Sequence, residues 1–464
     1  MRIVLADLAS TDGFVSKDTV AGGYGSRMRP FTRVTKVIIE MKRRIHDVPS
    51  IQLGHVASLF AARGHDIVFT RGEAVDGDLT LVLSSLVDYR RETAWARSQR
   101  ERGSRVGFVG LAASKMPELF ETAADFVIIG EPEHAAMRLA DGERLDGRVQ
   151  SPAIDDLDSL PFPRWDLLET RERAWMSLPF AGRPFGGMFP VMASRSCPEF
   201  CTYCPHRILA SHRMRSPENI VEEIAYLASL QPEPYVIFRD PLFTDDRDRV
   251  LALCDQIARR GLKLKFECET RLDHLDPVLL DTMHNAGLSA ISFGVETISP
   301  DTLKKSGRRY IPEAQQRLVI EECRRRGIVT AGFYVFGFLQ DTWDSIAATI
   351  EHSVDLGSTV AQFKILTPYP GTPMWKQLAP HIFETDWQKF DGFTPTFNHP
   401  NLTPDELKFL LGAAYTRFYM RPSYLANYLR VGSAGRGFIE WCDNLVSARH
   451  ERNERAMMAR AVTC

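Results

Sequence analysis

The sequence has no apolar run that approaches the roughly 18 residues of a membrane-spanning helix. Its first residues, MRIVLADLAS, are too short in apolar length for a secretion signal. It also lacks an excess of positive charge, because its net charge is −2, so nothing points to nucleic acid. With 44% hydrophobic residues, 31 glycines and 27 prolines, it is neither collagen-like nor largely disordered. We therefore expect a soluble cytoplasmic protein that binds neither nucleic acid nor a membrane.

Cysteine is scarce, with eight residues in 464, and three of them fall within one short segment. A disulfide framework would be denser and the chain smaller. Reduced thiols that bind a metal fit this usage better. The other five cysteines are scattered: Cys254, Cys268, Cys323, Cys442 and Cys464.

Residues 1–148 alternate strand and helix signals. Apolar runs such as LTLVLSS and DFVIIG are typical of strands buried on both faces, which predicts a parallel, doubly wound sheet with helices on either side. Residues 149–185 are rich in proline and aspartate near their start and are predicted to be a linker packed on a surface. The expected strands are 1–6, 66–70, 79–84, 105–111 and 125–129, and a helix is expected at 50–63.

Residues 186–380 contain a second βα series, which predicts an α/β barrel, partial or full, with its chemistry at the carboxyl ends of the strands. Residues 381–464 are predicted to be a helical extension. The expected strands are 188–194, 235–239, 264–268, 290–295, 330–336 and 360–366, and the expected helices are 217–230, 246–260, 277–286, 311–326 and 342–356.

The segment SRSCPEFCTYCPH places Cys197, Cys201 and Cys204 in a C-x3-C-x2-C motif directly after the first barrel strand. Three thiolates on one loop can hold three irons of a [4Fe–4S] cluster and leave the fourth iron open. The alternative is a structural zinc site in a non-catalytic protein, with His206 as the fourth ligand. That alternative is weaker, because Cys204 and His206 are close in sequence and no second C-x-x-C follows.

This motif, the aromatic Tyr203 before its third cysteine, and the six βα units resemble the radical S-adenosylmethionine (SAM) superfamily. The resemblance implies a [4Fe–4S] cluster on the three cysteines that binds and cleaves SAM to a 5′-deoxyadenosyl radical. It also implies a small-molecule substrate and an electron donor such as flavodoxin or ferredoxin.

The resemblance further implies SAM contacts at the strand ends. Asp240 would contact the SAM amino group, Arg271 its carboxylate, and Glu296 its ribose. Tyr203, Gly337 and Phe338 would lie near the adenine, with Thr270 and Gly294 completing the cofactor-binding set.

If the reaction on the substrate includes proton transfer, carboxylates would carry it. The candidates are Asp240 and Glu269, together with Glu267. Glu267 and Glu269 share one face of their strand. If that face is the outer one, both are merely solvated or paired with helix residues. Arg308 and Arg309 lie in a loop, where surface charge is the alternative to a functional role.

A doubly wound domain before the barrel, with the GEPE segment at 130–133, resembles the cobalamin-binding class of this superfamily, many of whose members are methyltransferases. The D-x-H-x-x-G motif for a histidine ligand is absent, and only a partial S-x-L match remains at Ser84–Leu86, so cobalamin is left open. The glycine-rich segment 21–28 either wraps a ligand or is a flexible loop.

The whole-chain pattern is similar to the apramycin-pathway diol dehydratase subgroup. That resemblance implies hydrogen abstraction from an aminosugar such as paromamine and loss of water. The resulting 4′-keto product would pass to a separate NAD(P)H-dependent reductase. The alternative is a cobalamin-dependent radical SAM C-methyltransferase.

Overall fold

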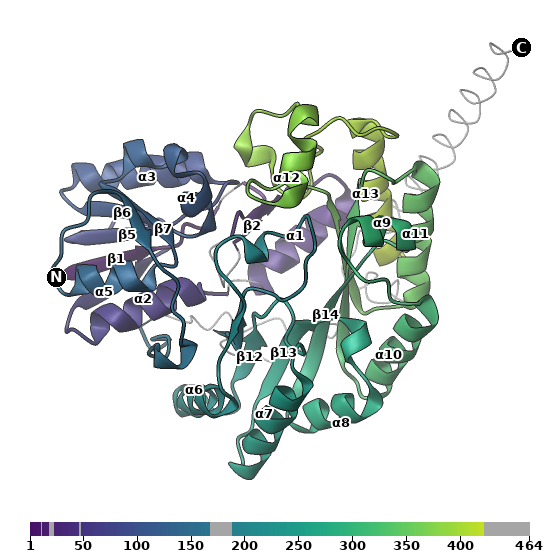
Figure 1. Cartoon of the computed structure of the whole chain (residues 1–464), viewed down its shortest axis with the longest axis horizontal. Coiled ribbons are helices and arrows are strands. Elements are labelled where there is room, and N and C mark those ends of the chain that lie inside the picture. The colour runs from purple at the N-terminus through teal and green to yellow at the C-terminus, as the bar shows by residue number, and fades with distance from the viewer. Residues whose placement is uncertain (11, 18–22, 46–47, 168–187, 422–464) are drawn as a thin grey trace, which may run out of the picture.

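A computed structural model describes residues 1–10, 12–17, 23–45, 48–167 and 188–421. They form two α/β units that lie side by side, one N-terminal and one from β9 onward (Figure 1). Parts of three sequence predictions fall outside the described residues: the start of the glycine-rich segment, the end of the linker and the last 43 residues, 422–464. No described helix is long and apolar enough to cross a membrane.

The N-terminal unit is a six-stranded parallel sheet in the order β4-β1-β5-β6-β7-β8. Five strands match the prediction. The sixth, β8, was missed because its sequence GRVQS is mostly polar, and it crosses the expected boundary at residue 148. The chain order reverses between β1 and β5, which is where doubly wound sheets bind ligands. The strands are β1 Arg2–Ala6, β4 Asp66–Thr70, β5 Leu79–Leu83, β6 Arg105–Val109, β7 Phe126–Gly130 and β8 Gly147–Ser151.

Helices cover both faces of this sheet (Figure 1): α2 and α5 on one, α3 and α4 on the other. Ser50 caps α2 by accepting a hydrogen bond from the Leu53 amide at 3.3 Å. Trp165 of the linker is fully buried and packs over Gly54 of α2, so the linker is packed here as predicted. The helices are α2 Ile51–Ala61, α3 Tyr89–Glu101, α4 Leu111–Lys115 and α5 Glu133–Ala140.

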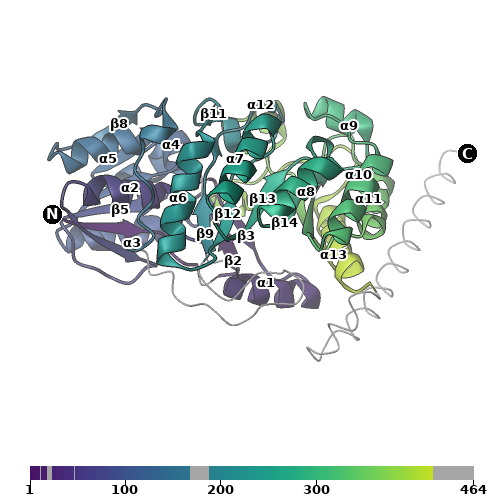
Figure 2. The ribbon, with the colours of Figure 1, turned by 90° about the horizontal axis from the view of Figure 1, so that it is seen from below.

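The segment between β1 and α2 was not predicted. It forms an antiparallel hairpin, β2 (Phe14–Ser16) with β3 (Ser26–Met28), and helix α1 (Arg33–Ile45). Helix α1 lies against the second unit and contacts α13 (Pro404–Tyr419), as Figures 1 and 2 both show. The N-terminal unit is thereby tied to the barrel by its own chain.

The second unit is an open sheet of six parallel strands in chain order, with β9 and β16 at its edges and helices outside. This confirms the predicted partial (βα)6 barrel. Its strands are β9 Met188–Val191, β12 Tyr235–Phe238, β13 Lys265–Thr270, β14 Leu288–Glu296, β15 Val329–Phe336 and β16 Val360–Ile365. Its helices are α6 Pro217–Leu230, α7 Arg247–Arg259, α8 Pro277–Asn285, α9 Pro300–Lys305, α10 Glu313–Arg325, α11 Trp343–Leu356 and α12 Pro373–Leu378.

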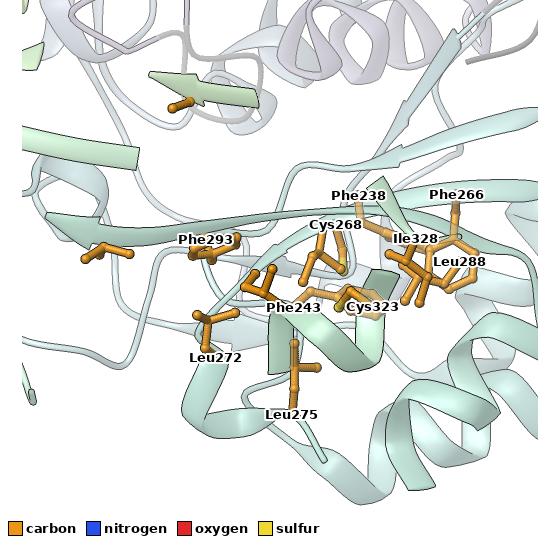
Figure 3. Packing of buried hydrophobic residues seen from close by; sticks show 14 of the residues in the cluster. Phe238, Phe243, Phe266, Cys268, Leu272, Leu275, Leu288, Phe293, Cys323 and Ile328 are labelled. Atoms are coloured by element: carbon orange, nitrogen blue, oxygen red, sulfur yellow. The ribbon is translucent and has the colours of Figure 1, made fainter. Parts of the chain in front are cut away.

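Three of the scattered cysteines, Cys254, Cys268 and Cys323, belong to the hydrophobic core of the barrel. Figure 3 shows Cys268 and Cys323 among Phe238, Phe266 and other apolar side chains between sheet and helices. They pack as small apolar residues. In the C-terminal region, α13 packs on α11 and β16, and the predicted helical extension is confirmed there, whereas residues 382–403 are mostly irregular.

Candidate active site at the cysteine loop

The three motif cysteines lie on the loop between β10 (Ser194–Arg195) and β11 (Arg213–Met214), a short antiparallel ribbon that follows β9. All three are free thiols of intermediate exposure, unlike the core cysteines. The Cys204 amide donates to the Cys201 carbonyl at 3.2 Å, which folds the loop back on itself. The loop therefore presents three thiols at the carboxyl end of the first barrel strand.

The thiols suit a cluster better than a single ion. A tetrahedral zinc with bonds of about 2.3 Å would hold its sulfurs about 3.8 Å apart. Among the described residues, no three His, Cys, Asp or Glu side chains are arranged to hold one metal ion. A [4Fe–4S] cluster binds each thiolate through a different iron, so its ligands need not converge on one point. Three free thiols on one loop thus match the ligand set of the cluster, whereas the described residues provide no set of four ligands for zinc.

A second loop, residues 306–309 after α9, lies against the cysteine loop. The Thr202 amide donates to the Ser306 carbonyl at 2.9 Å. Gly307, with φ at +70°, approaches so closely that an added Cβ would lie 2.4 Å from the Phe200 carbonyl oxygen. Two segments a hundred residues apart are therefore joined through their backbones.

Arg308 of this second loop points at the cysteines. Its Nη1 lies 3.8 Å from the Cys201 sulfur, and its Nη2 donates to the Gly294 carbonyl at 2.6 Å. The side chain is 11% exposed, whereas that of Arg309 is 61% exposed and pairs with Glu199 at 3.0 Å. The surface-charge alternative is thus wrong for Arg308 and fits Arg309. The doublet RR in a loop gave no signal that separates the two.

Gly294 and Glu296 lie at a bulge where the register of β14 and β15 shifts. Glu296 adopts a left-handed φ of 64° and lies 3.7 Å from Arg308. Burial raises the pKa of Glu296, and the positive charge of Arg308 opposes that rise. An added Cβ on Gly294 would lie 2.3 Å from the Glu296 carboxylate, so the glycine leaves room for this pair.

Two aromatic side chains predicted to lie near adenine do lie together. The rings of Tyr203 and Phe338 meet edge to face, with centroids 5.4 Å apart. Asp341 accepts hydrogen bonds from the amides of Gly337 and Phe338 at 2.9 and 3.0 Å, which fixes the turn after β15. Their contact with adenine stays a prediction.

Asp240 is fully buried, and both of its oxygens are bonded within the protein. It accepts from the Ala193 amide at 3.0 Å and from the Ser194 hydroxyl at 2.6 Å. These contacts fix the turn from β9 into the cysteine ribbon. Burial raises the pKa of Asp240. Its predicted contact with the SAM amino group stays a prediction.

Thr270 and Arg271 follow β13 and are also buried. Thr270 bonds the hydroxyl of Thr244, and Arg271 pairs with Asp273 through two bonds of 2.9 and 2.8 Å. The Nη1 atom of Arg271 is buried without a hydrogen-bond partner. That unpaired donor is the property expected of a carboxylate-binding arginine.

Glu267 and Glu269 are partly exposed, while the alternating residues Phe266 and Cys268 are buried in the core between sheet and helices. Their partners come from the neighbouring strand and its end: the Tyr235 hydroxyl donates to Glu267 at 2.9 Å, and Arg239 pairs with Glu269 at 2.8 Å. Both carboxylates therefore lie on the concave face of the sheet, and the alternative of an outer, helix-paired position is wrong. The catalytic role of Glu269 stays a prediction.

The carboxyl edge of the N-terminal sheet faces the barrel. Its apolar cluster is packed against by Ile208 and Leu209 of the cysteine loop and by Tyr369 after β16. The ring of Tyr24 stacks on that of Tyr369, with ring centroids 5.2 Å apart. At the switch point, Lys17 pairs with Asp7 at 3.2 Å and with Glu92 at 2.9 Å. The described residues at this edge thus contact one another.

Ion pairs also join the two units. Arg195 of β10 pairs with Glu131 at 3.0 Å and with Glu133 at 2.6 Å, and Arg213 of β11 also pairs with Glu131. The two glutamates belong to the GEPE segment. All four side chains are nearly or fully buried. The N-terminal unit therefore holds the ribbon that carries the cysteines.

Residues 191–352 match the family model of the radical SAM superfamily. An uncharacterized methyltransferase of Pyrococcus horikoshii is 30% identical over 60% of this chain and 61% of that protein. The anaerobic magnesium-protoporphyrin IX monomethyl ester cyclase of Cereibacter sphaeroides is 27% identical over 61% of this chain and 45% of that protein. The chain thus matches only about half of the length of these relatives. The bacteriochlorophyllide d C-8(2)-methyltransferase of Chlorobaculum tepidum is 22% identical over 74% of this chain and 78% of that protein.

Two solved structures share the fold. The radical SAM methyltransferase TsrM from Kitasatospora setae, with tryptophan and a SAM analogue, has a TM-score of 0.61 at 15% identity, over 91% of this chain and 90% of TsrM. The cobalamin-dependent SAM radical enzyme OxsB, with aqua-cobalamin and SAM, has a TM-score of 0.64 at 14% identity, over 97% of this chain and 71% of OxsB. The cysteine motif, the open βα barrel and the family match together identify residues 191–352 as a radical SAM domain.

Proposed function

We propose that the chain is a radical SAM methyltransferase that acts on a small organic molecule. The observation that carries the proposal is the cysteine loop, which lies where the barrel meets a doubly wound domain. TsrM and OxsB share this fold over nearly the whole chain, and two of the relatives named above are methyltransferases. These relatives support methyl transfer better than the dehydration of an aminosugar that the sequence resemblance implied.

In this proposal Cys197, Cys201 and Cys204 hold a [4Fe–4S] cluster. A cluster held there would, together with SAM, supply the radical chemistry that removes hydrogen from a substrate. The chain's own residues would orient SAM and the substrate and keep groups that quench the radical out of the site. The buried donor of Arg271 is available for the SAM carboxylate, and the edge-to-face pair of Tyr203 and Phe338 offers an apolar wall for its adenine.

Cobalamin is the second group that the relatives imply, and when bound it would carry the methyl group from SAM to the substrate. The chain lacks the D-x-H-x-x-G motif, which would supply a histidine ligand to the cobalt. The switch-point charges pair internally, because the Lys17 ammonium lies between Asp7 and Glu92. Tyr24 and Tyr369 are stacked at the same edge. These contacts lie at the edge where doubly wound sheets bind ligands.

That packing favours a second candidate function, in which the radical removes hydrogen and no methyl donor is needed. Dehydration of an aminosugar is such a reaction. The partly exposed carboxylates Glu267 and Glu269 on the concave face could bind a cationic aminosugar and move its protons. The electron donor of the flavodoxin or ferredoxin type, and a separate reductase for a keto product, belong to this proposal.

The test is anaerobic reconstitution of the full chain with iron, sulfide and hydroxocobalamin, followed by desalting and corrinoid analysis. Dithionite serves as reductant, with tryptophan, the substrate of TsrM, and paromamine as first probes. One corrinoid per chain and formation of S-adenosylhomocysteine would support the methyltransferase. No corrinoid and 5′-deoxyadenosine as the only SAM-derived nucleoside would contradict it and favour dehydration.

The cluster assignment has its own control. Cys201→Ala should abolish SAM cleavage, because it removes a ligand, whereas Cys254→Ala should leave cleavage unchanged, because Cys254 lies in the core. Circular dichroism checks that both variants fold. SAM cleavage retained by Cys201→Ala would refute the assignment.

A further inference from the structure

We propose that Arg308 is an electrostatic positioning residue for the cysteine loop, whose guanidinium stabilises electron density on the Cys201 sulfur and so raises the reduction potential of the cluster. The proposal rests on the proposed cluster on the three cysteines. It does not depend on whether the reaction is methylation or dehydration.

The geometry of the Arg308 side chain carries the proposal. Its Nη1 lies 3.8 Å from the Cys201 sulfur, within reach of a hydrogen bond to sulfur. Its Nη2 donates to the Gly294 carbonyl at 2.6 Å, and the Glu296 carboxylate lies 3.7 Å away. The fork of one guanidinium thus joins the cysteine loop to the end of β14.

The loop that carries Arg308 is held by backbone contacts. Ser306 accepts from the Thr202 amide at 2.9 Å, and Gly307 packs on the Phe200 carbonyl. Phe200 and Thr202 flank Cys201 in sequence. These backbone contacts therefore hold the guanidinium beside the Cys201 sulfur even when no ligand is bound.

Burial gives this contact its strength. The side chains of Arg308 and Glu296 are both 11% exposed, so solvent screens their charges poorly. A positive charge and an N–H donor beside a ligand sulfur favour the reduced cluster, because reduction adds negative charge. Glu296 opposes this effect by placing a negative charge on the other side of the guanidinium. The two residues should therefore shift the potential in opposite directions.

The experiment is a redox titration of the reconstituted full chain without SAM or substrate, followed by the electron paramagnetic resonance signal of the reduced cluster. Arg308→Gln should give a more negative midpoint potential than the wild type, and Arg308→Lys a smaller shift. Glu296→Gln should give a more positive potential. Arg309→Gln is the matched control, since its neighbouring guanidinium is exposed, and it should leave the potential unchanged.

Iron and sulfide analysis accompanies each variant. A full cluster at the wild-type potential in Arg308→Gln would overturn the proposal. If that variant takes up no cluster, Glu296→Gln decides, because an unchanged or lower potential there would equally overturn it. A chain that binds no cluster in its wild-type form would instead refute the proposed function. Leaving SAM out separates this role from a contact of Arg308 with SAM itself.

Discussion

Asp341 illustrates at the scale of one residue how burial acts on a carboxyl group. Its side chain lies beneath the turn after β15 and accepts hydrogen bonds from two amides, those of Gly337 and Phe338. Burial raises the pKa of Asp341 from 3.8 to about 7, although the two amides oppose the rise. The carboxyl therefore titrates near neutral pH in the folded protein and near pH 4 in the unfolded chain.

This difference predicts a pH dependence of stability. Between pH 4 and pH 7 the folded state binds more protons than the unfolded state, so the free energy of unfolding contributed by Asp341 falls as pH rises. Asp341→Asn should remove that fall, so the variant gains stability relative to wild type as pH goes from 4 to 7. Urea unfolding across this range measures it. Parallel profiles for the two proteins would contradict the prediction, and the exposed Asp405→Asn is the control.

At the scale of elements, the loop 306–309 matters because it meets the cysteine loop through a glycine. Gly307 and Gly327 share a φ of +70°, but only Gly307 has neighbours where a Cβ would be. A substitution by alanine would therefore meet the same unfavourable backbone conformation at both glycines, but a steric clash only at Gly307.

Gly327→Ala should cost about 1–2 kcal/mol of stability, the cost of a left-handed conformation. Gly307→Ala should cost more, because its Cβ would lie 2.4 Å from the Phe200 carbonyl, and it should also lower the iron bound per chain. Denaturant unfolding and iron analysis of both variants test this. Equal losses of stability and full iron in both would show that the contact between the loops is unimportant.

For the whole molecule, the buried pairs of Arg195 with Glu131 and Glu133 join the N-terminal unit to the ribbon that carries the cysteines. Glu133 is fully buried, and its Oε2 atom has no hydrogen-bond partner, so Arg195 supplies its compensating charge. Removal of Arg195 leaves Glu133 without its cation, whereas Glu131 keeps Arg213, and an unpaired buried carboxylate costs far more than loss of a surface pair.

Arg195→Met should therefore lower the free energy of unfolding by about 3–5 kcal/mol. The exposed pair of Arg144 and Asp146 is the control, and Arg144→Met should change stability by no more than about 0.5 kcal/mol. The double variant Arg195→Met with Glu133→Gln should recover part of the loss, because it removes a charge that Arg195→Met leaves unpaired. Similar stabilities of all three variants would disprove the coupling between the units.

The sequence alone predicts the class of protein and most of its elements. Apolar runs and helical spacing mark buried strands and their covering helices because these signals are local, and three cysteines within eight residues need no tertiary structure to be recognised as one site. Two elements were missed for different reasons: β8 is mostly polar, whereas α1 has helical spacing of its apolar residues that the sequence analysis did not use. Only the tertiary structure brought Arg308 to Cys201, set Glu267 and Glu269 on the concave face, and closed the edge between the units with Tyr24 and Tyr369. Each of these depends on contacts between residues far apart in the chain, which follow from how the barrel closes and how the two units pack and not from the spacing of residues along the sequence.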